Sequence, residues 1–262
     1  MSRQEIPPIL LDGVPIRSFT FTKETLDDGL PVIQDDGKSA ANLLREYKTE
    51  EVNGQGFWSL RLLRHILSRD RVLDELRKYP NLDAETYVDY IRPEEEANPD
   101  SKTPTYLRIF ALLVLLKKGP DIVTFIKDNV SDQTLPLHRR PSTPKWLVDL
   151  GCENSPGNVL QCLQKWEPHD RESFERVQWE LLVPYFDLDK NSRARHYLLD
   201  DRIILPWCKR EKFSLSSTKL SKNEGGFAFV NCIKIDPLSH GFHEVLKAVR
   251  LFLYSLVQTN VS

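Results

Sequence analysis

Apolar side chains recur every three or four residues through most of the chain, the spacing that places them on one face of an α-helix. The longest such pattern runs from Phe57 to Tyr79 and carries Leu60, Leu63, Leu67, Leu73 and Leu76. Shorter patterns occupy residues 83–92, 121–129, 159–166 and 170–184. Each of these stretches is predicted to be a helix whose apolar face packs inward.

The most apolar part of the sequence is the stretch from Tyr106 to Leu116. Thr103 can cap a helix here and Pro104 suits its first position, whereas the Gly119-Pro120 pair ends it. A helix that is apolar on all sides has no face to turn toward water. The pattern therefore predicts a central helix around which the other helices pack.

Both ends of the chain depart from this helical pattern. Residues 1–37 are rich in Pro, Asp and Gly and contain a short strand-like alternation, Phe-Thr-Phe-Thr, at positions 19–22. Beyond residue 195 a strand, a glycine turn and a second strand are predicted. The chain is therefore expected to be mainly α. An extended or partly disordered arm spans residues 1–37, a helical bundle spans 38–190, and a small C-terminal β-hairpin lies within 195–262.

The composition is that of an ordinary globular protein, with 40% hydrophobic and 28% charged residues and a net charge of −2. This balance argues against a nucleic-acid or membrane surface as partner, since either would favour a concentrated positive field. No apolar run reaches the roughly 20 residues of a membrane span, and Pro7 and Pro8 interrupt the place of a signal peptide. An intracellular protein is expected, in either the cytoplasm or the nucleus.

The sequence offers little for metal or disulfide chemistry. Its four cysteines form no Cys-x-x-Cys pair and are expected to be reduced, mostly buried thiols; they are Cys152, Cys162, Cys208 and Cys232. His240 and His243 are three residues apart, but no third ligand stands at a suitable spacing. No metal site is predicted.

A glycine turn lies between the two predicted strands of the hairpin, in the sequence Asn223-Glu-Gly-Gly-Phe-Ala-Phe-Val230. It resembles the glycine-rich loop of protein kinases, Gly-x-Gly-x-x-Gly-x-Val. In that register Gly225 stands at the second glycine and Val230 at the valine, while Asn223 and Ala228 replace the other two glycines. Such a loop brings backbone N–H groups close to phosphates.

Flanking stretches extend the resemblance. Leu199 to Pro206 before the turn and Ile233 to Pro237 after it look like the entry to the kinase-like domain in a large group of fungal proteins. In that group a helical region precedes the kinase lobe. The stretch from Phe174 to Phe186 looks like the Gln-Trp…Pro-x-Phe sequence that closes this region. The chain thus resembles a fungal protein kinase-like protein, from its helical region to the start of the kinase N-lobe.

The resemblance implies ATP as a ligand, with Gly225, Gly226 and Val230 as the binding residues. It does not extend to catalysis, because the sequence contains no His-Arg-Asp or Asp-Phe-Gly triplet to supply the catalytic and magnesium-binding aspartates. Lys247, 17 residues after Val230, could match the strand lysine of a kinase, but Glu244 to Gln258 has the spacing of an amphipathic helix. We expect a truncated, non-catalytic protein with vestigial nucleotide binding.

A helical protein-interaction module is the alternative. The chain has five tryptophans, and its helical part shows no catalytic set, so residues 38–190 could serve to bind a protein partner without any nucleotide. A large exposed apolar patch would favour this alternative.

Overall fold

The structure, a computed structural model, describes residues 10–11, 14–15, 29–34, 37–93, 104–140, 149–152, 160–186, 197–212 and 231–241. The chain divides into two units, residues 1–32 and residues 33–262. In the first unit, strand β1 (Leu10–Leu11) pairs antiparallel with strand β2 (Val14–Pro15). Residues 19–22 lie outside the described residues, so the predicted nature of the 1–37 arm stays a prediction.

The second unit is mainly helical. Its α-helices are α1 (Ala40–Glu46), α2 (Leu60–Ile66), α3 (Arg69–Arg77), α4 (Ala84–Ile91), α5 (Leu107–Leu115), α6 (Ile122–Lys127), α7 (Gln161–Gln164) and α8 (Pro168–Val177). Short 3-10 helices are η1 (Gly119–Asp121), η2 (Gln178–Leu181) and η3 (Pro237–Ser239). Antiparallel pairs join β3 (Thr49–Glu50) to β4 (Gly56–Phe57), β5 (His138–Arg139) to β6 (Leu150–Gly151), and β7 (Trp207–Lys212) to β8 (Asn231–Ile235). The mainly α fold with a small C-terminal hairpin is confirmed.

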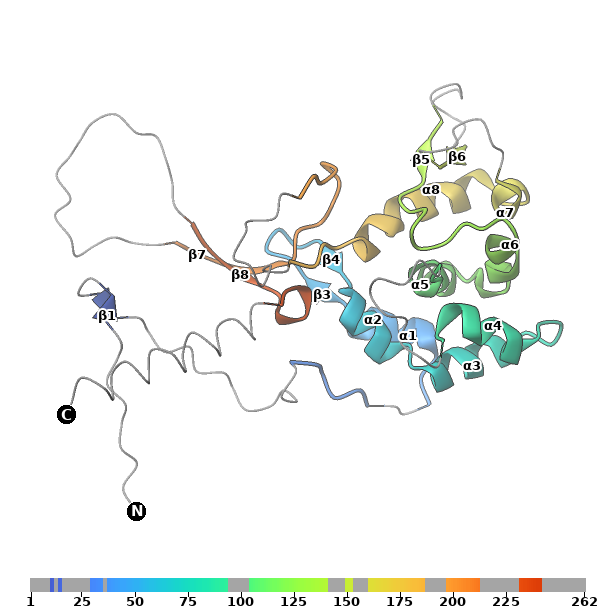
Figure 1. Ribbon diagram of the computed structural model, residues 1–262, viewed down its shortest axis with the longest axis horizontal. Coiled ribbons are helices and arrows are strands. Elements are labelled where there is room, and N and C mark those ends of the chain that lie inside the picture. Colours follow the sequence, from blue (N-terminus) through green and yellow to red (C-terminus); the bar gives the residue numbers. More distant parts are fainter. Residues whose placement is uncertain are drawn as a thin grey trace, which may run out of the picture. The chain divides into compact units, whose positions relative to one another are not determined.

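Helix α5 is the centre of this unit. It packs against α1, α2 and α6, and Figure 1 shows it between the α3–α4 pair and α8. Seven of its residues are buried, on all sides of the helix: Leu107, Ile109, Phe110, Ala111, Leu112, Leu113 and Val114. The prediction of a central helix is therefore confirmed. In the described ranges, no helix has the length and apolar character that crossing a membrane requires.

Short polar side chains begin four of the helices. Ser39, Ser59, Ser68 and Asp83 each accept a hydrogen bond from the backbone N–H three residues further on, a donor for which the helix itself has no acceptor. Ser68 caps a helix start in the middle of the single helix that was predicted for residues 57–79. The structure therefore has two helices there, α2 and α3, because the Ser68 cap starts a new helix where α2 ends.

The start of α5 is capped by a residue distant in sequence. The Oδ1 atom of buried Asp132 accepts the backbone N–H of Ile109 at 3.0 Å, and its Oδ2 atom accepts the hydroxyl of Thr105 at 3.1 Å. No local side chain caps the helix, which begins at Leu107. The expected start at Pro104 is therefore wrong, because the acceptor that fixes this end comes from the segment after α6.

Burial raises the pKa of Asp132, and its hydrogen bonds to Ile109 and Thr105, together with the charge of Arg108, offset this only in part. The folded protein therefore binds this proton more tightly than the unfolded chain does. It follows that the contribution of Asp132 to stability falls as the pH rises from about 4, the ordinary pKa of an aspartate, through the raised value.

We expect Asp132→Asn to gain stability relative to the native protein as the pH rises through this window. Asn keeps an acceptor for the N–H of Ile109 and carries no charge to bury. Urea unfolding from about pH 4 to pH 8 measures the difference. Asp132→Ala is the control: it leaves a buried donor unsatisfied and should be about 2 kcal/mol less stable than D132N at every pH. An offset between D132N and the native protein that does not change with pH would contradict this assignment.

The ends of α5 and α6 share one geometry. Lys117 has a φ of 60°, in the left-handed region, and its N–H donates to the carbonyl of Val114 at 3.2 Å. The N–H of Lys118 donates to the carbonyl of Leu113 at 2.7 Å, which completes a Schellman turn. Asn129, with a φ of 54°, ends α6 in the same way. Glycine or asparagine usually occupies this position, because a Cβ atom is strained there.

Lys117→Gly should therefore stabilise the protein by about 1 kcal/mol, because glycine removes the strain of the left-handed conformation. Asn129→Gly is the matched control and should gain only a few tenths of a kcal/mol, since asparagine tolerates this conformation. Thermal or urea unfolding measures both. Equal gains at the two positions, or a loss of stability in K117G, would be inconsistent with strain at Lys117.

A buried glutamine joins the segment after α6 to the end of α8. The Oε1 atom of Gln178 accepts the N–H of Leu137 at 2.8 Å, and its Nε2 atom donates to the carbonyl oxygens of Leu137 at 2.9 Å and Glu175 at 3.1 Å. The side chain is fully buried, so these bonds satisfy groups that have no access to water. This pairing fixes the chain immediately before β5.

Candidate functional site

The predicted C-terminal hairpin is formed by β7 and β8. The two strands pair antiparallel from Trp207 opposite Ile235 to Lys212 opposite Asn231. The register shifts between Trp207 and Lys209, so the pairing contains an irregularity at Cys208. Residues 213–230 connect the two strands in sequence.

The predicted nucleotide-binding residues belong to this connection. Gly225, Gly226 and Val230 lie outside the described residues, and the same is true of Lys247 and His243. The structure therefore describes both strands that flank the glycine turn, while the ATP-binding role of the turn stays a prediction. His240 is described and forms an isolated parallel bridge with Phe186.

Backbone hydrogen bonds tie the hairpin to the helical part. The N–H of Val52, just after β3, donates to the carbonyl of Trp207 at 2.8 Å. On the other side, Phe186 donates its N–H to the carbonyl of Ser239 at 2.8 Å and accepts the N–H of Gly241 at 2.9 Å. The segment that follows η2 thus pairs with the segment that follows β8. The start of β7 and the end of β8 are both held in this way.

A small apolar cluster lies beside these bonds. Phe57, Val183 and Ile204 are buried against one another, and Cys208 packs on them. Burial raises the pKa of the Cys208 thiol to about 11, with the charge of Asp236 adding to the rise. This thiol therefore stays protonated at neutral pH and is a packing group, not a nucleophile.

Arg202 joins the segment that precedes β7 to three elements of the helical part. Its guanidinium stacks 4.2 Å from the centre of the Trp179 ring and donates to Nδ1 of His138 at 3.1 Å. A carboxylate oxygen of Glu175 lies 3.8 Å from its Nη1 atom, and Asp200 binds its Nε atom at 3.1 Å. Planar stacking combined with several hydrogen bonds is a geometry that arginine can provide and lysine cannot.

Arg202→Ala should loosen the hairpin and leave the helical core intact. Hydrogen exchange of the β7 and β8 amides should become about five-fold faster, the effect of losing about 1 kcal/mol of stacking and hydrogen bonding. Arg202→Lys should behave almost like the alanine variant, because it keeps the charge and loses the planar contact. Arg77→Ala, which breaks ion pairs within the α3–α4 region, is the control and should not change exchange in the hairpin. Unchanged exchange in R202A would show that Arg202 does not hold the hairpin.

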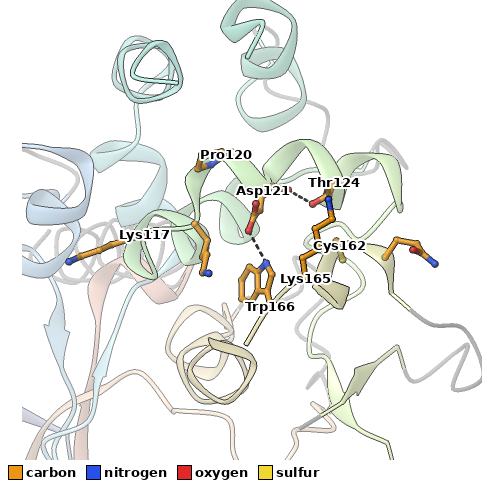
Figure 2. Close-up of a pocket in the computed structure, with 9 residues that line it drawn as sticks. Lys117, Pro120, Asp121, Thr124, Cys162, Lys165 and Trp166 are labelled. Atoms are coloured by element: carbon orange, nitrogen blue, oxygen red, sulfur yellow. Dashed lines mark hydrogen bonds between the residues drawn. The ribbon is translucent and has the colours of Figure 1, made fainter. Parts of the chain in front are cut away.

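The helical part has a pocket of about 380 Å³ where α5 ends, α6 begins and α7 follows. Three lysines, Lys117, Lys118 and Lys165, line it together with Trp166 and Cys162. In Figure 2, the side chain of Lys117 points away from Trp166, and Lys165 lies on the other side of the indole ring, near Cys162. The pocket thus combines cationic side chains with an apolar wall.

Trp166 is held rigidly in that wall. Its Nε1 atom donates to a carboxylate oxygen of Asp121 at 2.7 Å, the contact drawn as a dashed line in Figure 2. Phe125 and Phe174 pack against its ring, with centroid separations of 6.1 and 5.8 Å. Trp166 as a whole is 5% exposed.

The ion pairs of the pocket are unevenly distributed. Lys118 binds Asp170 at 2.6 Å and lies over the Trp166 ring at 5.5 Å. Lys117 and Lys165 have no ion pair with any residue that the structure describes. Burial raises the pKa of the Cys162 thiol, and neighbouring Asp128 raises it further, so this sulfur stays protonated. The pocket can therefore attract an anion, but it offers no activated nucleophile.

Sequence reasoning did not find this pocket. Lys117 and Lys118 come directly after the apolar stretch of α5, and Lys165 and Trp166 lie more than 40 positions further along the chain. No local pattern connects these two segments. The link is the hydrogen bond between Asp121 and Trp166, which only the folded chain brings together.

Comparison with known proteins adds no family. No family model, no curated protein and no solved structure matches this chain.

Proposed function

We propose that this chain is a protein kinase-like nucleotide-binding protein without phosphotransfer, in which the helical part supports the first hairpin of a kinase-type N-lobe. The observation that carries the proposal is the pairing of β7 with β8 on either side of the glycine turn. A glycine-rich loop needs two antiparallel strands that hold its ends close together, so that backbone N–H groups can approach phosphates.

The stretch that resembles the fungal kinase-like proteins gives further support. Gln178 and Trp179 lie at the junction of the helical part and the hairpin, where Gln178 pairs with Leu137 and Trp179 stacks on Arg202. Phe186 pairs with the segment after β8. The residues that carry the resemblance therefore join the helical part to the hairpin. This is expected if the two parts pack together as a helical region and the kinase-type lobe that follows it.

Residues 1–262 are proposed to bind the nucleotide without transferring its phosphate. Transfer requires a catalytic aspartate and a magnesium-binding aspartate, and neither signature triplet occurs in this sequence. Two of the three loop glycines are replaced, by Asn223 and Ala228, so weak binding is expected.

Mg-ATP should raise the unfolding temperature of the protein. At ten times Kd the ligand contributes about 1.4 kcal/mol, which corresponds to about 4 °C for a chain of this size. Replacing Gly225 and Gly226 together by valine should abolish the shift, because side chains would keep the phosphates from the backbone.

Lys127→Gln, an exposed lysine at the end of α6 and far from the glycine turn in sequence, is the control and should keep the full response to Mg-ATP. No shift at about 5 mM nucleotide would end the nucleotide-binding proposal. Transfer of labelled phosphate to any acceptor would instead overturn the non-catalytic part.

A helical protein-interaction module remains a second candidate, and a specific observation favours it. Leu198 is fully exposed, and its sequence neighbours Tyr197 and Leu199 are each more than a third exposed, as is Tyr185 next to Phe186. The ring of Tyr197 packs 5.3 Å from that of Phe186, which places these side chains near the junction with the hairpin. Exposed aromatic and aliphatic side chains of this kind are typical of protein-binding surfaces.

A further inference from the structure

We propose that the pocket between α5, α6 and α7 binds a small organic anion, a phosphate ester or a carboxylate. The site is separate from the hairpin, and none of the residues that line it belongs to β7, β8 or their connection. The proposal is therefore independent of nucleotide binding at the glycine turn.

Charge is the first argument. Lys117 and Lys118 come from the turn that ends α5, and Lys165 comes from the residue after α7. Of the nearby acids, Asp170 is paired with Lys118, and Asp121 accepts the indole N–H of Trp166. The ammonium groups of Lys117 and Lys165 thus have no carboxylate partner among the described residues. An anion that enters the pocket would gain charge-assisted hydrogen bonds from Lys165, and from Lys117 when its exposed side chain turns toward the ligand.

The shape of the pocket limits the ligand. A volume of about 380 Å³ is at the lower end of the range for small-molecule sites. Pro120 and the edge of Trp166 offer apolar surface, and Thr124 and Gln161 offer polar groups. A single charged group on a compact apolar body matches this combination. Because Trp166 is fixed by Asp121, Phe125 and Phe174, this wall needs no rearrangement on binding.

The backbone of Lys117 is the second, independent argument. Its left-handed conformation costs stability that glycine would restore, yet the sequence has lysine here. Strained residues of this kind concentrate at ligand sites, where the side chain they present has a use. The same turn at the end of α6 has asparagine, which tolerates the conformation, and Asn129 does not line the pocket.

The indole N–H signals of the five tryptophans in an NMR spectrum of the full chain test the proposal. The signal of Trp166 is assigned with Trp166→Phe. Titration with inorganic phosphate, phenyl phosphate and benzoate should shift this signal saturably with at least one probe, while the other four serve as internal references. The phosphate and benzoate arms distinguish the two kinds of charged group.

Lys165→Gln should weaken binding about three-fold, as expected for one partly exposed charge, and Lys165→Arg should restore it. Lys117→Gln should have a similar effect without loss of stability. Lys127→Gln is the matched control, because this exposed lysine ends α6 outside the pocket. Two results would overturn the proposal: no saturable shift of Trp166 up to about 10 mM of any probe, or equal weakening by K127Q and K165Q.

Discussion

Helix α5 is buried on all sides, and the backbone groups at both of its ends find partners elsewhere in the protein. The first N–H groups and the last carbonyls of a helix have no acceptors or donors within it. At the start, Asp132 reaches back from the segment after α6 to accept the N–H of Ile109. At the end, the N–H groups of Lys117 and Lys118 and the guanidinium of Arg45 serve the last carbonyls. The elements that supply these groups are therefore fixed in place around α5.

The pocket follows from how α5 ends. The left-handed Lys117 ends α5, and η1 and α6 follow in contact with it. Asp121, the last residue of η1, then accepts the indole N–H of Trp166. Two adjacent lysines thereby come to the same surface as Lys165. A more common glycine ending would give the same turn with one charge fewer. The positive charge of the pocket thus comes from the lysine side chains at this turn, and the backbone geometry of the turn does not require them.

The sequence predicted the elements whose cause is local and missed those whose cause is distant. Tyr106 to Leu116 was predicted as the central helix because its own side chains require burial, and the hairpin because strand-forming residues flank two glycines. The start of α5 was not predicted correctly, because its cap, Asp132, lies 23 residues after Ile109. The break at Ser68 has a local signal, a serine that can cap, which the continuous leucine spacing obscured. The pocket depends on two distant segments, and neither shows a motif alone.

The residues that resemble the fungal kinase-like proteins act in this chain mainly as a junction. Gln178 binds both the N–H and the carbonyl of Leu137, which an amide can do and a carboxylate or an ammonium cannot. Trp179 provides the face on which Arg202 stacks, and Phe186 pairs by its backbone with the segment after β8. Gln178 and Trp179 act through the chemistry of their side chains, whereas Phe186 contributes its backbone groups. These contacts therefore give the stretch a role in joining two parts of the chain, and that role is the same whether or not the glycine turn binds a nucleotide.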